Sequence, residues 1–441
     1  MPPDATPIRD SRPRFAQHAK KFARAVLLLA GIGAGLWGGV TWMHFSQVEA
    51  ARSACQKWES ERNWSKLLVA AHEWRRLEPT RRDAMQAGAT ASRELRQPNS
   101  VFEFLKDHPA ETKGDAPWLS MLASAQMGPL KDPLTGLSTL QKVLTLDPKE
   151  TEVRRRIIFF HAVMVQPVEL LAVVRDSAEN EADLPEFYAY AFLADGLKLS
   201  NALERIKRWM RGDRDEPMMV AYALNSARNL DGGVPPMDEA EATKLRHSQA
   251  LRASYLQQLR EMFPENHHVL AYDLGQAVSN GQTVMCAELL SRATAVADGD
   301  YRFWRARGWL FLKAGDFVEA QRAFDEALKL HPIDWRTRYY LADLNRRNRR
   351  LDVADQEYQL AAEGKELESA FLAASDVQHI PHELFDRLRV FAGKCGDELV
   401  AQRLEVLLST SKTGRASPSV VPNRRRQAAS QQLQTLKREF P

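Results

Sequence analysis

The sequence predicts an all-α protein, an α-solenoid of repeated helix–turn–helix units that follows one N-terminal transmembrane helix. Beyond residue 48, apolar residues recur at positions i, i+3, i+4 and i+7 in blocks separated by short polar or Pro/Gly turns. The strict alternation of apolar and polar residues that marks β-strands is lacking. A spacing of about 34 residues relates several of these blocks, which is typical of stacked helix pairs.

The composition excludes several classes of function. The 441 residues include 61 Lys and Arg against 57 Asp and Glu, and a net charge of +4 is too small to attract nucleic acid by bulk electrostatics. The three cysteines, Cys55, Cys286 and Cys395, lie far apart, so neither a disulfide framework nor a cysteine metal site is expected. We therefore expect no cofactor, no metal and no nucleic-acid partner.

An apolar run at residues 25–45, AVLLLAGIGAGLWGGVTWMHF, predicts a transmembrane signal anchor. As a helix it would reach about 31 Å at roughly 1.5 Å per residue, enough to span a bilayer core. The basic tail at 1–24 is richer in Lys and Arg than the segment after the run, where only Arg52 and Lys57 follow closely. The positive-inside rule then places the N-terminus in the cytoplasm and the rest outside it, in the periplasm if the organism is bacterial.

The apolar run leaves two alternatives open. Cleavage before Ala51 would release a soluble secreted protein, although the run exceeds the usual length of a signal-peptide core. Gly31, Gly35 and Gly39 repeat at four-residue spacing, which would give a smooth face for close helix–helix approach and self-assembly. The GxGxxG pattern at 33–38 follows no strand, so a dinucleotide site is not expected.

Residues 301–334, YRFWRARGWLFLKAGDFVEAQRAFDEALKLHPID, carry the strongest repeat signal. The segment alternates small residues, which let two helices approach closely, with large residues that fill the space beside them. Its structural positions are Trp304, Gly308, Phe311, Ala320, Phe324, Ala327 and Pro332. In these residues the segment resembles the tetratricopeptide repeat, which implies a pair of helices whose second member ends before Pro332.

A shift of 34 residues in either direction lands on further helix pairs that are in phase with this one. Weaker matches occur upstream at 117–150 and 48–81. The stretches 82–116, 151–184 and 185–218 hold helix pairs of the right length without signature residues. The predicted segments are a basic tail (1–24), the anchor (25–45), degenerate repeats (48–230), a phase break with a long helix (231–266), tetratricopeptide repeats (267–364), capping helices (365–408) and a disordered basic tail with a short helix (409–441).

No catalytic or nucleotide-binding motif occurs, so we expect a binding protein and not an enzyme. The resemblance implies a superhelix whose concave face, lined by the first helix of each pair, binds partners. The groove residues that it implies are Arg302, Arg305, Trp309, Lys313, Arg336, Tyr339, Asp343 and Arg346. Because arginine forks suit carboxylates and aromatic rings supply rigid apolar area, the expected ligand is an acidic extended peptide or chain terminus.

The leading hypothesis is a membrane-anchored tetratricopeptide scaffold that binds another protein on the extracytoplasmic side, in envelope assembly, secretion or chaperone-like handover. The alternative is a structural role in which the glycine face of the anchor drives formation of a homo-oligomer and the solenoid serves as a docking rod. An enzyme would need a titratable cluster in a closed pocket, and the sequence does not show one.

Overall fold

The computed structural model describes residues 13–199, 201–210, 215–228, 239–374 and 377–412. Side chains are described from residue 37 onward, except those of residues 378, 411 and 412 and some of those in 240–252. Every regular element in these ranges is helical. Much of the predicted basic tail, the Gly/Pro-rich break at 231–236 and the C-terminal tail from 413 lie outside the described residues. The all-α prediction is confirmed for the part of the chain that is described.

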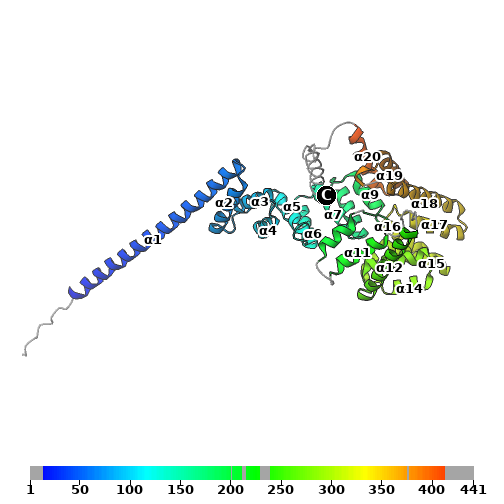
Figure 1. Ribbon diagram of the computed structural model, residues 1–441, viewed down its shortest axis with the longest axis horizontal. Helices are drawn as coiled ribbons and strands as arrows, with labels where there is room; N and C mark the ends of the chain where they lie inside the picture. Colours follow the sequence, from blue (N-terminus) through cyan, green and yellow to red (C-terminus); the bar gives the residue numbers. More distant parts are fainter. Residues whose placement is uncertain (1–12, 200, 211–214, 229–238, 375–376, 413–441) are drawn as a thin grey trace, which may run out of the picture. The chain divides into compact units, whose positions relative to one another are not determined.

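The chain divides into two compact units, Met1–Leu130 and Lys131–Pro441 (Figure 1). This division falls inside the range expected to form one degenerate array, 48–230, and not at the phase break expected at 231–266. The first unit contains α1 (Pro13–Ser60), α2 (Trp64–Leu77), α3 (Arg82–Glu94), α4 (Pro98–Leu105) and α5 (Ala116–Met127).

Helix α1 is a single helix of 48 residues. It runs from the predicted basic tail through the apolar run and into the range expected to form degenerate repeats. Its described part exposes Trp37, Trp42 and Phe45. Among the residues that the structure describes, no helix is both long and apolar enough to cross a membrane.

The glycine face proposed for α1 falls mostly on side-chain positions that lie outside the described residues, since Gly31 and Gly35 precede residue 37. Gly39 is described, and a Cβ placed on it would meet no atom within 4 Å. This glycine therefore packs against nothing in the described structure.

Helices α3 and α4 pack through a glycine and an aromatic ring. A Cβ placed on Gly88 of α3 would collide with the ring of Phe104 on α4. Phe104 is fully buried, so the missing side chain at Gly88 is what lets the ring lie against the helix backbone. The same two positions, sixteen residues apart, are occupied by Gly308 and Phe324 in the strongest repeat, so 82–116 does carry signature residues.

The second unit contains fifteen α-helices in its described residues. They are α6 (Pro133–Leu146), α7 (Thr151–Val163), α8 (Pro167–Glu179), α9 (Pro185–Phe192), α10 (Ala202–Trp209), α11 (Glu216–Arg228), α12 (Glu239–Met262), α13 (His267–Ser279), α14 (Thr283–Ser291), α15 (Tyr301–Ala314), α16 (Phe317–Leu330), α17 (Trp335–Arg347), α18 (Leu351–Leu372), α19 (His382–Lys394) and α20 (Glu398–Lys412). Helix α18 passes the expected repeat boundary at 364 and ends at Leu372.

The pair α15–α16 has the close packing that its small residues predict. A Cβ on Gly308 would lie 2.5 Å from the ring of Phe324, which is fully buried between the two helices. Ala320 and Ala327 are buried as well, whereas Trp304, Phe311 and Pro332 are half-buried. Gly315 adopts a φ of +83° at the turn between the helices, a left-handed conformation that glycine reaches without a steric cost.

The end of α16 follows from the proline after it. The helix stops at Leu330, and His331 is its C-cap. Because Pro332 disfavours the helical conformation for the residue before it, the chain leaves the helix at His331. Asp334 then caps α17 by accepting a hydrogen bond from the backbone N–H of Arg336.

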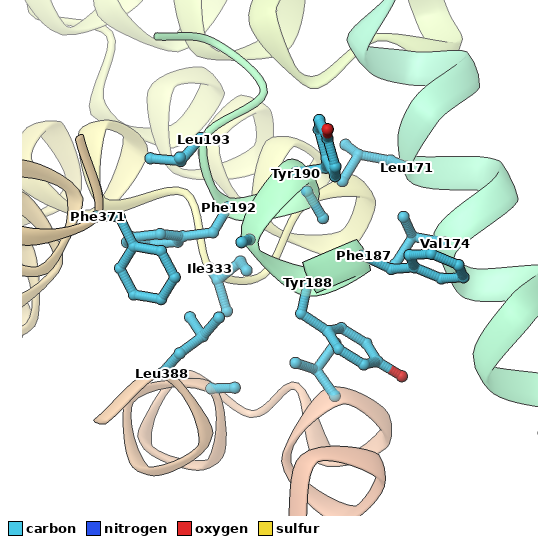
Figure 2. Packing of buried hydrophobic residues seen from close by; sticks show 14 of the residues in the cluster. Leu171, Val174, Phe187, Tyr188, Tyr190, Phe192, Leu193, Ile333, Phe371 and Leu388 are labelled. Atoms are coloured by element: carbon cyan, nitrogen blue, oxygen red, sulfur yellow. The ribbon is translucent and has the colours of Figure 1, made fainter. Parts of the chain in front are cut away.

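Helix α9 forms the centre of the largest apolar core of the second unit. All six residues from Phe187 to Phe192 are buried, which is typical of a helix surrounded on every side. Figure 2 shows Phe192 beside Phe371, with Leu388 and Ile333 also lining this core. The repeats therefore do not leave an empty channel at this point, because α9 fills it.

The C-terminal helices pack against helices that lie far away in the sequence. Arg403 of α20 donates a hydrogen bond of 2.7 Å to the buried carboxylate of Asp183, which lies just before α9. Arg175 of α8 lies 3.3 Å from Asp397. An ideal solenoid has contacts only between neighbouring repeats. The second unit departs from that pattern, because α20 contacts both α8 and α9.

Candidate binding groove

The predicted groove residues line two adjoining hollows of the second unit. We call the first the arginine cavity, a space of about 230 Å³ whose charged lining residues are Asp195, Lys198, Arg228, Arg302, Arg305 and Arg336, together with His268. We call the second the tyrosine groove, two hollows of about 550 and 520 Å³ that share Tyr339, Tyr340 and Tyr358. Their other polar, charged and aromatic lining residues include Trp309, Lys313, Trp335, Arg336, Asp343, Arg346, Arg347, Asp355 and Lys365. Arg336 and Tyr340 line both the arginine cavity and the tyrosine groove.

In the arginine cavity, Arg305 is bound from two sides. Its guanidinium donates to Asp334 at 2.7 Å and to Asp195 at 2.9 Å. The hydroxyl of Tyr301 donates a further hydrogen bond of 2.6 Å to Asp195. Asp195 follows α9 directly, so the buried helix carries this carboxylate into the predicted groove. The position expected to bind an acidic ligand thus already holds an acidic residue of the same chain.

Arg302 and Arg336 are also paired within the chain. Arg302 is buried and donates to both carboxylate oxygens of Asp300, with its Nη2 at 2.6 Å. Arg336 donates to Glu368 at 3.0 Å. Gly196 lies against this second pair, since a Cβ placed on it would be 3.1 Å from the Glu368 carboxylate.

These ion pairs determine whether the buried carboxylates of the arginine cavity are protonated. Burial alone would raise the pKa of Asp195, but the guanidinium groups of Arg305, Arg336 and Arg302 outweigh it and hold that pKa well below its usual range. The pKa of Asp300 is lowered in the same way by Arg302, against the effect of burial. Both carboxylates are therefore charged at neutral pH.

In two other groups of the cavity, burial makes the protonated, positively charged form less favourable. Burial, with the positive charge of Arg302, lowers the pKa of His268 to about 3, so this ring is neutral at pH 7. Burial also lowers the pKa of Arg228 to about 10, which still leaves it charged. Arg228 thus keeps a positive charge in surroundings that stabilise it poorly.

The tyrosine groove presents exposed aromatic rings. Tyr339 of α17 is 46% exposed and Tyr358 of α18 is 54% exposed, with their ring centroids 5.7 Å apart. Trp309 lies deeper and is almost fully buried, and the ammonium of Lys313 lies 5.7 Å from its ring centroid. Such rings offer apolar contact area at little conformational cost.

The charges of the tyrosine groove are mostly positive. Asp343 is already paired, with Arg346 at 2.7 Å and Arg347 at 3.1 Å. Lys313 and Lys365 are exposed and add one positive charge to each of the two hollows of this groove. The groove therefore favours an acidic or neutral ligand over a basic one.

The structure separates the eight predicted groove residues into two sets. Arg302 and Arg305 lie in the arginine cavity, Arg336 lines both this cavity and the tyrosine groove, and the other five line the tyrosine groove. Sequence reasoning did not find Asp195 and Arg228, because they come from the turn after α9 and from the end of α11, far from the repeat that predicted the groove. Tyr358 could have been found, since it occupies in 335–364 the position that Phe324 occupies in 301–334.

Close histidines do not form a metal site. His267 pairs with Asp300 at 2.8 Å and stacks on Phe303, so its ring has a structural role beside the arginine cavity. Over the described ranges, no three His, Cys, Asp or Glu side chains are arranged to hold a metal ion.

Comparison with known proteins identifies part of the groove. Residues 305–367 match the tetratricopeptide repeat family. The match begins in α15 and ends in α18, so the tetratricopeptide segment provides every lining residue of the tyrosine groove except Ser279. The resemblance predicted from the sequence is confirmed over this segment.

Two solved structures show a weak likeness to the chain. One is the TPR domain of P58(IPK), 14% identical, with a TM-score of 0.21 over 68% of this chain and 97% of that one. The other is the assembly chaperone of RpL4 (Acl4), 11% identical, with a TM-score of 0.19 over 74% of this chain and 99% of that one. No curated protein sequence matches the chain. Because both TM-scores are this low, neither likeness supports an inference about the arrangement or the function of this chain.

Proposed function

We propose that this chain is a membrane-anchored, non-enzymatic scaffold that binds an acidic, extended segment of another protein in its tyrosine groove. The single observation that carries the proposal is the pair of exposed rings of Tyr339 and Tyr358 within a basic hollow of the tetratricopeptide segment. Exposed aromatic residues grouped in a concave surface are the usual anchors of peptide recognition.

The charge of the groove supports an acidic partner. Asp343 is neutralised by Arg346 and Arg347, while Lys313 stays exposed beside Trp309. A carboxylate on the partner would reach this ammonium while an apolar side chain packs on Tyr339. The arginines first expected to hold the ligand, Arg302 and Arg305, pair with the chain's own carboxylates, so we assign direct contact to the tyrosine groove.

Membrane attachment through the apolar run at 25–45 belongs to the same proposal. It is supported by the length and apolarity of that run and by the basic residues before it. The exposure of Trp37, Trp42 and Phe45 on α1 also supports it, because these aromatic residues have no packing role in their own unit. With the N-terminus in the cytoplasm, the groove works on the extracytoplasmic side.

Site-specific photo-crosslinking in cells tests the groove. A photoreactive amino acid at Tyr339 or Tyr358 should crosslink a partner at a segment rich in Asp and Glu, and Lys313→Glu should abolish that product. Two controls lie on α16, namely the photoreactive residue at exposed Val318 and the matched charge reversal Lys329→Glu. Equal products from Val318 and Tyr339, or products unaffected by Lys313→Glu, would refute the proposal.

The topology has its own test. Protease added to intact cells or to spheroplasts should cut the second unit, without any opening of the cytoplasmic membrane, if the groove lies outside the cytoplasm. Protection until the cytoplasmic membrane is opened would contradict the proposed side of the membrane.

A further inference from the structure

The arginine cavity holds more positive than negative charge. Among the described residues, its cations are Lys198, Arg228, Arg302, Arg305 and Arg336, and the carboxylates that contact them are Asp195, Asp300, Asp334 and Glu368. His268 adds no charge, because its pKa is lowered to about 3. One positive charge in the cavity is therefore left without an anion.

Arg228 and Lys198 are the two cavity cations that no described carboxylate contacts, since Arg305 pairs with both Asp195 and Asp334. Arg228 is the more buried of the two. Within the described residues, its one hydrogen bond is a long one of 3.5 Å from Nη2 to the backbone carbonyl of Ala194. A guanidinium carries five N–H donors, so most of its capacity is unused. A half-buried cation without a counter-ion is unfavourable, and the lowered pKa of this group agrees with that. Lys198 lines the same cavity, with its side chain exposed at the edge.

We propose that the arginine cavity binds one small oxyanion, a carboxylate or phosphoryl group, held by Arg228 and Lys198. The volume of about 230 Å³ lies below the usual range of roughly 300–1,000 Å³ for small-molecule pockets, so the cavity accepts a single group and not a whole ligand. Asp195 repels an anion in principle, but its carboxylate already accepts hydrogen bonds from Tyr301 and Arg305. Arg228 is free to bind the anion as a fork, which is the geometry that carboxylates and phosphates favour.

The oxyanion has two sources. One is free phosphate, and the other is an acidic side chain of the segment bound in the tyrosine groove, since Arg336 and Tyr340 line both this groove and the arginine cavity. The second source rests on the proposed function, whereas the first is independent of it.

Thermal unfolding of the full chain in detergent micelles, in phosphate-free buffer at constant ionic strength, tests the site. The midpoint should rise with added inorganic phosphate and then saturate. Arg228→Gln should weaken the apparent phosphate affinity about tenfold or more, the value of a charged hydrogen bond or two. Without phosphate the same variant should be at least as stable as the wild type, because it removes an unpaired cation.

The matched control is Arg347→Gln, a cation of the tyrosine groove that should leave the phosphate response unchanged. Lys198→Gln should weaken the response less than Arg228→Gln does, since Lys198 is exposed. A response that is absent, or equal in the wild type and Arg228→Gln, means an adventitious ion only and overturns the proposal. An Arg228→Gln variant that loses stability while its phosphate response stays intact would also overturn the proposal. The role of Arg228 would then be limited to its hydrogen bond with the Ala194 carbonyl.

An acidic peptide with both ends blocked separates the two sources. If phosphate displaces the peptide and Arg228→Gln weakens both, the partner supplies the oxyanion. If the affinity for the peptide is changed neither by added phosphate nor by Arg228→Gln, free phosphate is the ligand. Loss of peptide binding in Tyr339→Ala alongside a missing phosphate response would refute this site while leaving the proposed function in place.

Discussion

The guanidinium of Arg305 lies 2.9 Å from the carboxylate of Asp195, a residue 110 positions earlier in the chain. This pair joins the turn after buried helix α9 to the first helix of a tetratricopeptide repeat. Because Tyr301 and Arg305 both donate to it, Asp195 fixes that turn against the concave side of the repeat. The concave side of the repeat, which the repeat sequence predicts to be open, is therefore partly filled by another segment of the same chain.

The first prediction concerns the stability that this pair provides. Asp195→Ala leaves Arg305 with one carboxylate fewer in a site where both side chains are nearly buried. Removal of one partner of a buried pair costs about 3–5 kcal/mol, and we expect a loss of that order in denaturant unfolding. Asp298→Ala is the control, because its pair with Arg307 is exposed on the aspartate side and should contribute nothing measurable. Equal effects of the two substitutions would contradict the assigned role.

The same carboxylate predicts a dependence of stability on pH. The pKa of Asp195 is lower in the folded protein than in the unfolded chain, so its contribution is complete above the unfolded value, about 4. It is lost as the pH falls from there toward the folded pKa. Below pH 4 the unfolding midpoint of wild type should fall more steeply than that of Asp195→Ala. If the unfolding midpoints of the two proteins fall equally steeply below pH 4, Asp195 does not titrate as a buried, paired group.

The sequence predicted those features that depend on local spacing. The helix pair at 301–334 follows from a repeat whose pattern lies within one stretch of chain. The same pattern predicted Trp309, Lys313 and Tyr339 as groove residues, whereas Tyr358 was not among the predicted residues. The filling of the concave side by α9 could not be predicted, because FYAYAF is buried on every side of the helix and gives no indication of which helices surround it. Asp195 and Arg228 reach the cavity only through that long-range packing.

The repeat at 82–116 shows a different limit. Its Gly88 and Phe104 have the spacing of Gly308 and Phe324, but the other signature positions are occupied by different residues. Two residues are too weak a signal in a chain with many glycines. The packing makes the relationship clear, since each glycine lies directly beneath its phenylalanine ring.

A second prediction tests this glycine packing. In Gly308→Ala the new methyl would meet the Phe324 ring at 2.5 Å, and overpacking of this kind typically costs about 1–3 kcal/mol. Gly275→Ala is the matched control, because this helical glycine has nothing within 4 Å and the change should be neutral or stabilising by up to about 1 kcal/mol. Adding Phe324→Leu should be less harmful in Gly308→Ala than in wild type, and a double-mutant cycle measures this coupling.

A third prediction ranks two aromatic residues of the repeat. The sequence alone suggests a loss of about 3–5 kcal/mol for Trp304→Ala, if that side chain were fully buried. Trp304 is only half-buried, whereas Phe324 is completely enclosed. We therefore expect the full loss for Phe324→Ala and a distinctly smaller one for Trp304→Ala, although the latter also removes a hydrogen bond of 2.9 Å to the Asp298 carbonyl. Denaturant unfolding that reverses this order would contradict the burial assigned here.

The final prediction tests the packing of α20 against α9. Asp183 is fully buried and accepts hydrogen bonds from Arg403 and from the hydroxyl of Tyr188. Arg403→Met removes the only arginine bound to that carboxylate in the described structure, so about 3–5 kcal/mol should be lost. Hydrogen exchange should then accelerate in both α20 and α9, because the two helices share one core. Arg387→Met is the control, since its pair with Glu366 is exposed and should change no exchange rate. Faster exchange in α20 alone would show that α9 keeps its place without the C-terminal helix, and the second unit would then be a solenoid with a loosely attached end.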